Sequence, residues 1–463
     1  MSLSPSNELH LTVTAGSPLA EVFLINHDFA LVERSVGDLQ CNVPPGVYKI
    51  KTKLADATAE RLVLLEESAE LDVSGDLAVG SPVPIARAGL ERSRDMEGWP
   101  VPSGDDAPRM TESAEVFLVS RSGSSTDEPP TMSLHRLDGT TIESLEPRAG
   151  GLPGEQSTTI KIDPGPYLVR RWDRLGDVLE QCVYAVPGWQ TQVFALEEFG
   201  DEANEIGRSR VSVLMSRHRF DPHDPQLPLI EEARTALADE RKVATETMGE
   251  LFEASDNPML GLFGAHLMLI ARDAGLQQEE GRATGRLDEH AVTAPVQFDQ
   301  ARFNRIVHRL VRVLGPGHPD VVALATQRTD QSLGSLQPVS APPMLWRSWV
   351  LLIAASNAMP SLVPVSTWQH TLHVLPLRPF FLWTSTEQRS EVSETWTRNI
   401  ASSLSGRSSA SRRGGTPRVR SFGLDTAGPA EPLAAGDDAR RRASEQLLVP
   451  RAAIDRLAEG ESL

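Results

Sequence analysis

Short apolar segments bounded by turn residues dominate the first 200 positions of this 463-residue chain. Each segment either alternates apolar with polar positions or is apolar throughout, as strands buried on one or both faces do. The pattern predicts strands at 21–25, 47–53, 61–65, 115–119, 158–162, 167–171, 183–186 and 192–196. The amino-terminal part of the chain should therefore be β-structure.

Two motifs occur twice in this region, in the same order, which indicates an internal repeat. The sequence AEVFL stands at 20–24 and again at 114–118, and a P-G-x-Y pattern stands at 45–48 and at 164–167. The second copy is longer, because about 25 additional residues separate its two motifs. The Ser/Gly/Pro-rich stretch 121–157 is the expected place of this insertion.

The P-G-x-Y motif has a physical reason to precede a strand. Pro fixes φ and Gly accepts a positive φ, so the pair forms a tight turn. We expect Tyr48 and Tyr167 to close the core, each with its hydroxyl hydrogen-bonded. The arrangement resembles small bacterial β-sandwich modules of the PEGA and transthyretin-like kinds. That resemblance implies modules that act as carriers, spacers or contact surfaces.

After Pro225 the apolar positions follow helical spacing, which predicts a helix that ends near Ala254. A capping residue followed by Pro258 then starts a second helix that is apolar nearly all round. This helix should lie in the middle of a helical domain, with Gly261 and Gly264 allowing close approach of a neighbour. His266 lies within the same run and is expected to be a core histidine.

A helix predicted at about 298–314 carries a row of arginines beside its apolar stripe. Their spacings of three, four and three residues place them on one face of the helix. One interpretation is a solvated face paired with nearby carboxylates. The other is a docking surface for an acidic partner, such as the chain's own acidic β half. The candidate partner-binding residues are Arg302, Arg305, Arg309 and Arg312.

Further elements are expected between 318 and 383. A short helix should begin at 318–320, an apolar helix should span 342–358, and 370–383 should be a strand or an irregular packed segment. The segments DNPMLGLFGAHLMLI, GPGHPDVVAL and PPMLWRSWVLL resemble motifs of uncharacterised bacterial proteins whose gene neighbourhoods encode caspase-like or trypsin-like peptidases. The resemblance implies a peptidase as a candidate partner.

From about 388 the composition shifts to Ser, Arg and Gly, and 401–420 holds five arginines and no acid. We expect this tail to be disordered, with a short terminal helix within 437–459. The predicted fold class is α+β multidomain: two tandem small β-sandwich modules, an α-helical bundle and a disordered carboxyl-terminal tail. The expected divisions are module 1 at 1–80, a linker at 81–112, module 2 at 113–200, a linker at 201–225, the helical domain at 226–387 and the tail at 388–463.

The formal charge of −18 is unevenly distributed. Residues 1–200 hold 31 acidic and 16 basic residues, a balance of −15, whereas 201–463 hold 32 and 29, a balance of −3. An acidic half of this kind repels nucleic acid and anionic lipid. We therefore expect no nucleic-acid partner.

The remaining composition points to a cytoplasmic bacterial protein. Only Cys41 and Cys182 are present, which excludes a disulfide framework and a Cys-rich zinc site. No basic region followed by an apolar core opens the chain. The longest uninterrupted apolar run, 349–355, is far shorter than a membrane span of roughly 20 residues. Five lysines accompany 40 arginines, a bias typical of GC-rich bacterial genomes.

Motifs of common catalytic sites are absent from the sequence: there is no phosphate-binding loop, nucleophile elbow, H-E-x-x-H helix or EF-hand loop. We therefore expect no cofactor and no catalytic residues. Two histidine groups remain as weak metal candidates, since imidazole and carboxylate together can bind a divalent ion. They are His218, Asp221, His223 and Asp224 in a connector, and the pair His370 and His373.

Three functional hypotheses follow. The leading one is a non-enzymatic adaptor or scaffold that mediates protein–protein contacts and regulates a peptidase-containing system. An enzyme, hydrolase-like or metal-dependent, with an unrecognised site around His266 or 218–224 is the second. The third is a membrane-active effector whose helical domain refolds and inserts. A deep pocket with perturbed ionisable residues would favour the second, and liposome leakage would favour the third.

Overall fold

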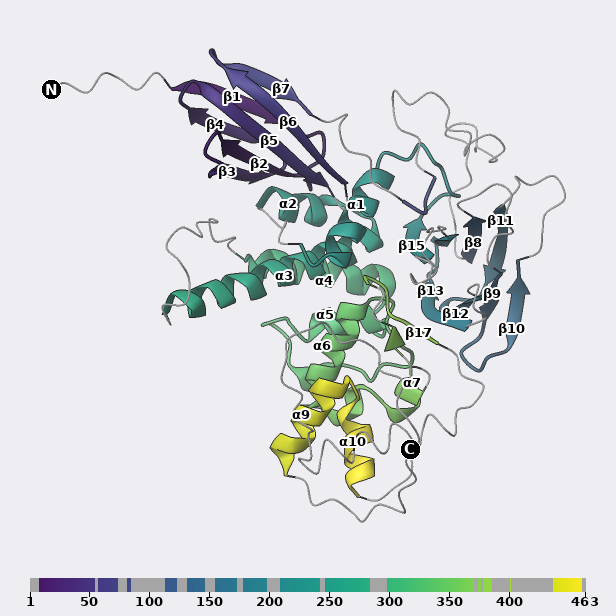
Figure 1. Ribbon diagram of the computed structural model, residues 1–463. Helices are drawn as coiled ribbons and strands as arrows, with labels where there is room; N and C mark the ends of the chain where they lie inside the picture. Colours follow the sequence, from purple (N-terminus) through teal and green to yellow (C-terminus); the bar gives the residue numbers. More distant parts are fainter. Residues whose placement is uncertain are drawn as a thin grey trace, which may run out of the picture. The chain divides into compact units, whose positions relative to one another are not determined.

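The structure is a computed structural model that divides the chain into two compact units. The first unit comprises 1–176, 183–315 and 377–380, and the second comprises 177–182, 316–376 and 381–463. The residues that the structure describes are 8–54, 57–73, 81–84, 113–122, 131–145, 155–172, 178–197, 209–241, 246–283, 298–369, 371, 374–375, 378–384, 400 and 436–459. Strands dominate the amino-terminal part and helices follow, so the predicted α+β multidomain class is confirmed (Figure 1).

Module 1 is a sandwich of two sheets, drawn in purple in Figure 1. Its strands are β1 (Leu9–Thr14), β2 (Glu21–Asn26), β3 (Leu31–Val36), β4 (Leu39–Val43), β5 (Gly46–Leu54), β6 (Ala57–Leu65) and β7 (Ala69–Asp72). One sheet has the order β4-β1-β7, with β1 antiparallel to β4 and parallel to β7. The other is antiparallel, with the order β3-β2-β5-β6. Alternate side chains from both sheets, such as Leu11, Val22 and Ile50, form the core.

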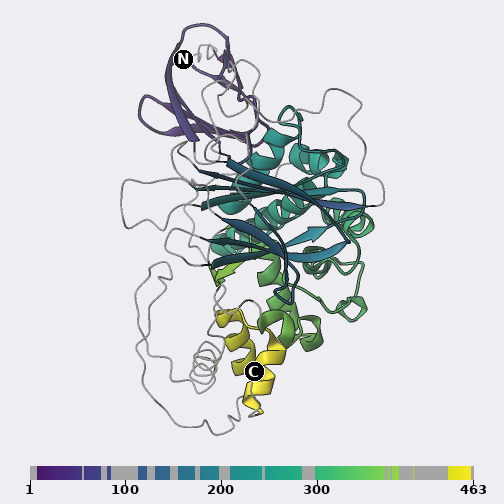
Figure 2. The same ribbon diagram turned by 90° about the vertical axis from the view of Figure 1, so that its right-hand side faces the viewer.

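Module 2 repeats this topology strand for strand, and Figure 2 shows its blue strands in two layers. Its strands are β8 (Ala114–Ser122), β9 (Met132–His135), β10 (Thr141–Ser144), β11 (Glu155–Ile162), β12 (Gly165–Trp172), β13 (Val178–Ala185) and β14 (Gln190–Glu197). β8 lies between antiparallel β11 and parallel β14, as β1 lies between β4 and β7. β9 pairs with β10 and β12, as β2 pairs with β3 and β5, and β13 follows β12 as β6 follows β5.

The two P-G-x-Y motifs are structurally equivalent. Each connects the fourth strand of its module to the fifth. The Tyr48 hydroxyl donates to the Pro44 carbonyl at 2.8 Å, and the Tyr167 hydroxyl donates to the Asp163 carbonyl at the same distance. Both rings are buried. The predicted tandem repeat, with its two core tyrosines, is therefore confirmed.

The two AEVFL segments, by contrast, are not equivalent. Residues 20–24 lead into β2, the second strand of module 1, whereas 114–118 lie on β8, the first strand of module 2. The expected insertion at 121–157 contains β9 and β10, which are the counterparts of β2 and β3 rather than additions. The stretch expected to be a linker at 201–225 also contains a strand, β15 (Ser209–Ser216), which extends the β11-β8-β14 sheet.

Helices complete the first unit. They are α1 (Leu227–Ala238), α2 (Glu246–Ala254), α3 (Pro258–Ala283) and α4 (Gln300–Leu314). The single helix expected up to Ala254 is two helices, because α1 ends at Ala238 and Glu240 adopts a positive φ of 51°. As predicted, Asn257 caps α3: its Oδ1 accepts the backbone N–H of Met259 at 3.0 Å.

Helix α3 is the centre of this helical region, in agreement with its all-round apolar sequence. It packs against α1, α2, α4 and β15, and His266 is completely buried. Gly264 faces the Phe252 ring of α2 and Gly261 faces Leu310 of α4, so both glycines allow the predicted close approach. Among the described residues, α3 is the one helix that contains a stretch long and apolar enough to cross a membrane, Pro258–Leu276. This stretch is 78% buried inside the protein.

The second unit is built around α5 (Pro319–Ala325) and α6 (Trp346–Ser356), which pack together. Its other elements are η3 (Leu333–Ser335), η4 (Pro360–Leu362), α7 (Val365–Gln369), β16 (Val374–Leu375), β17 (Leu382–Thr384), α9 (Asp437–Leu447) and α10 (Arg451–Ala458). The expected terminal helix is a pair, α9 and α10, and both pack on α6. The arginine-rich stretch 401–420 lies outside the described residues.

Candidate protein-interaction surface

The sheet β3-β2-β5-β6 of module 1 has a second face that points away from the core, and we call it the outer face. Strand β5 shows the division most clearly: Tyr48, Ile50 and Thr52 are buried, while the alternating Val47, Lys49 and Lys51 are not. The register extends the outer face to the neighbouring strands. It includes Phe23 and Ile25 of β2, Leu31 of β3, Val47, Lys49 and Lys51 of β5, and Thr58, Glu60, Leu62 and Leu64 of β6.

Large apolar side chains gather at one end of this face. Leu62 is 75% exposed and Leu64 is 62% exposed, and the register places Leu64 opposite Val47. Leu31 is also exposed and lies opposite Ile25 in the strand pairing. Phe29, in the turn between β2 and β3 at the same end, is 85% exposed. Single exposed apolar residues are ordinary, but a group of them on one sheet indicates an interaction site.

Basic residues stand beside the apolar group. Three of the five lysines of the chain, Lys49, Lys51 and Lys53, belong to β5. The Lys49 ammonium lies 2.5 Å from the Glu60 carboxylate, and that of Lys51 lies 3.8 Å from it. The hydrogen bond from Lys49 and the charges of both lysines hold the pKa of Glu60 below its usual value. The face therefore combines exposed leucines with a small excess of positive charge, in a strongly acidic chain.

Sequence reasoning did not single out the outer face, although β6 carried a signal. Its segment ERLVLL ends in four consecutive apolar residues. A strand buried on one face only should alternate, so the apolar residues on its solvent side exceed what the core requires.

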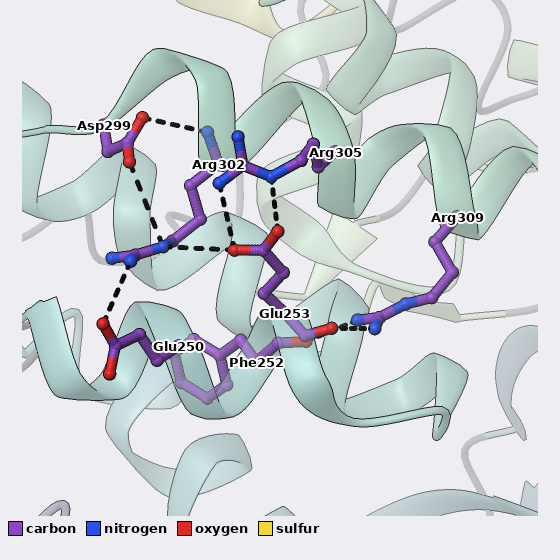
Figure 3. A network of polar contacts seen from close by, with 7 residues as sticks. All are labelled: Glu250, Phe252, Glu253, Asp299, Arg302, Arg305 and Arg309. Carbon is purple, nitrogen blue, oxygen red and sulfur yellow. Dashed lines mark hydrogen bonds and ion pairs between the residues drawn. The ribbon is translucent and has the colours of Figure 1, made fainter.

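Three arginines of the α4 row, Arg302, Arg305 and Arg309, bind groups of α2 within the first unit (Figure 3). Arg302 pairs with Glu250 at 3.4 Å and with Glu253 at 3.3 Å, and Arg305 also pairs with Glu253. Arg309 donates to the backbone carbonyls of Phe252 and Glu253. The interactions hold α4 against α2.

The geometry matches the interpretation of a face paired with nearby carboxylates. Arg312 is exposed, and so is part of Arg305. Contact of the four arginines with a separate partner stays a prediction.

The weak metal candidates are not assembled into a site. The Asp221 carboxylate accepts the backbone N–H of His223, and that of Asp224 accepts the N–H of Gln226, as in local turns. His218 is exposed. No group of three or more potential ligands occurs in the part of the chain that the structure describes. His370 and His373 lie outside the described residues.

The most strongly perturbed ionisable pair was not recognised from sequence. His318 and Asp320 flank Pro319 at the start of α5, and both are buried, with His318 Nδ1 3.7 Å from Asp320 Oδ2. Burial lowers the pKa of His318 to about 3 and raises that of Asp320 to about 6. Asp320 accepts the backbone N–H groups of Met344 and Leu345, the two residues that precede α6, so its carboxyl group holds the start of that helix to α5.

No family model matches the sequence, and no curated protein is similar to it. Among solved structures, the Bacillus anthracis TIE protein is 11% identical with a TM-score of 0.15, and the match covers 35% of this chain and 28% of that one. A putative cell adhesion protein from Bacteroides ovatus is 8% identical with a TM-score of 0.14, over 44% of this chain and 94% of that one. TM-scores of this size indicate no common fold over the whole chain.

Proposed function

We propose that this protein is a non-enzymatic bacterial adaptor or scaffold that acts in the cytoplasm, and that the outer face of module 1 is its contact surface. The exposed leucine pair Leu62 and Leu64 is the observation that carries the proposal. Covering such side chains with a partner removes apolar area from water, which is the main driving force of protein association. A peptidase is the candidate partner that the sequence resemblance suggests.

Buried contacts give the proposed scaffold a fixed geometry inside the first unit. Glu21 of module 1 pairs with Arg241, which follows α1, and Ser17 donates to Glu232 of α1. Glu231 accepts hydrogen bonds from Ser81 at 2.7 Å and from Ser212 of β15. A contact surface presented by module 1 is therefore held in place relative to α1 and β15, as a scaffold requires.

The proposal is tested by placing negative charges in the outer face. The double variant Leu62→Asp/Leu64→Asp introduces charge into the outer face, and Leu276→Asp is the matched control, because Leu276 is 54% exposed on α3. Proteins retained by the wild type from the native host would be identified by mass spectrometry, purified and titrated against all three forms. We expect the double variant to bind at least tenfold more weakly and Leu276→Asp to bind as the wild type does. Equal binding by all three forms would contradict the proposal.

A further inference from the structure

Strand β6 is the last strand of its sheet, and it is long for an edge strand. It spans Ala57–Leu65, and among the described residues it pairs with β5 alone. Natural proteins commonly protect edge strands by making them very short or by placing charged residues or proline on them. The charged residues of β6 are Glu60 and Arg61, and the four residues that follow, Leu62–Leu65, carry neither charge nor proline. The described outward positions of β6 are Thr58, Glu60, Leu62 and Leu64.

The register shows which backbone groups of β6 remain open. Leu54 of β5 lies opposite Ala57 of β6 with only two residues between them, so they are a hydrogen-bonded pair of a hairpin. Hydrogen-bonded and non-bonded pairs alternate along an antiparallel ladder. Lys49–Leu62 and Val47–Leu64 are therefore non-bonded pairs, and the N–H and C=O groups of Leu62 and Leu64 point away from β5.

Module 2 shows how an equivalent edge is covered. Strand β13 holds the position of β6 in the repeated topology. Within the second compact unit β17 pairs antiparallel with the first half of β13, with Glu180 opposite Trp383. The Trp383 side chain is fully buried, and its Nε1 donates to Glu180 Oε2 at 2.7 Å. A short apolar segment from a distant part of the chain thus completes this edge.

We propose that β6 receives an additional antiparallel strand from a partner protein, in the way that β17 is added to β13. The added segment is extended, about five or six residues long, and carries apolar side chains at alternate positions that pack on Leu62 and Leu64. Main-chain hydrogen bonds to β6 supply affinity, and the outer face supplies selectivity for apolar residues. The inference rests on the proposed function, because it specifies how the partner binds.

The decisive variant removes one backbone donor. Leu62→Pro deletes an N–H that points away from β5, so the ladder of the module keeps its hydrogen bonds. Leu62→Val is the matched control, since it keeps the N–H and an apolar side chain. The probe is a phage-displayed library of decapeptides, selected on the full-length wild type, from which the enriched sequence is synthesised. Thermal unfolding of each variant reports whether it is folded.

We expect enriched peptides to alternate apolar and polar residues. Such a peptide should bind Leu62→Val within about twofold of the wild type and bind Leu62→Pro at least tenfold more weakly, the effect of losing one hydrogen bond at the edge. A second measurement uses only wild-type protein. N-methylation of every second peptide residue should abolish binding when the methylated N–H groups are those that face β6. Methylation of the other half of the residues should preserve binding, because their N–H groups point away from β6.

Several outcomes would overturn the inference. They are equal binding to a folded Leu62→Pro, N-methylation effects without alternation, and selections that enrich no alternating peptide. A wild-type dimer that dissociates in Leu62→Pro would assign the edge to a second copy of this chain instead. If the host partner binds Leu62→Pro normally but fails to bind Leu62→Asp/Leu64→Asp, the proposed function stands and the added strand does not.

Discussion

The guanidinium of Arg241 and the carboxylate of Glu21 form a buried ion pair across 220 residues of sequence. Arg241 Nη2 and Nε lie 2.5 and 2.9 Å from Glu21 Oε2. Arg34 donates to the other carboxylate oxygen at 2.5 Å. Although burial alone would raise the pKa of Glu21, the hydrogen bonds and charges of both arginines lower it below its ordinary value of 4.5. The pair ties module 1 to the segment that follows α1.

Replacing Arg241 by Met should destabilise module 1, because Glu21 would stay buried with only Arg34 as its cationic partner. We expect a loss of about 3 kcal/mol, typical of removing one partner of a buried pair. Hydrogen exchange of the β2 amides measures it.

The same pair predicts a pH dependence. A carboxyl whose pKa is lowered by folding contributes stability above its unfolded value, and that contribution is lost as the pH falls through the folded value. The free energy of unfolding of Glu21→Gln should therefore fall less steeply than that of the wild type as the pH drops below about 4.5. An unchanged acid profile in Glu21→Gln would contradict the linkage.

Two glycines of α3 should respond oppositely to substitution by alanine. A Cβ on Gly264 would lie 2.3 Å from Phe252 Cγ, whereas a Cβ on Gly275 would meet no atom within 4 Å. Gly264→Ala should therefore cost about 1–3 kcal/mol through overpacking. Gly275→Ala should stabilise by about 0.5–1 kcal/mol, because alanine loses less backbone entropy in a helix. Urea unfolding of the two variants measures both values, and the same sign for both would refute the packing argument.

The arginines of α4 separate into structural and exposed positions. Arg309 donates to the carbonyls of Phe252 and Glu253 at the end of α2, while Arg312 is exposed in the last turn of α4. Arg309→Ala should cost about 1.5–3 kcal/mol, the range for a hydrogen bond made by a charged group. Arg312→Ala should change the free energy of unfolding by less than about 0.5 kcal/mol. Chemical unfolding distinguishes them, and equal effects would show that the contacts with α2 carry no stability.

Local signals in the sequence predicted much of the fold. Turn chemistry and alternation located β2, β5, β8, β11, β12 and β14, and the Asn257 cap located the start of α3. The alignment of the repeats was wrong by one strand, because AEVFL satisfies the requirements of any half-buried strand and so carries no topological information. The break after α1 was missed, because the apolar spacing continues past Glu240, whose positive φ closes a helix-ending turn in which the Arg241 N–H donates to the Ala236 carbonyl at 2.9 Å.

The candidate surface could not be predicted, because its definition needs the register of four strands. Leu31, Val47 and Leu64 come from three segments, and only strand pairing brings them onto one face. Alternation shows that a residue faces away from its own core, but it does not show what lies beside it. The arginine row of α4, in contrast, was visible at once in the sequence, although its carboxylate and carbonyl partners on α2 were not.

The buried pair at the start of α5 predicts opposing pH effects in the second unit. Between its folded pKa of about 3 and its ordinary value of 6.5, His318 binds fewer protons in the folded state, so its contribution to stability rises with pH. Between 3.8 and its folded pKa of about 6, Asp320 binds more protons in the folded state, so its contribution falls with pH. Over the shared window the two effects cancel, and the wild type should show little net slope from this site.

Single substitutions should reveal each slope. In Asp320→Asn only His318 of the pair still titrates, so the free energy of unfolding should rise by up to about 1.4 kcal/mol per pH unit between pH 4 and 6. In His318→Gln only Asp320 still titrates, so the free energy of unfolding should fall with pH over the same range. The measurement is the urea midpoint against pH, followed by hydrogen exchange of the α5 and α6 amides, which belong to the second unit. Parallel profiles for the wild type and Asp320→Asn would show that Asp320 titrates normally and that its carboxylate stays charged at the start of α6.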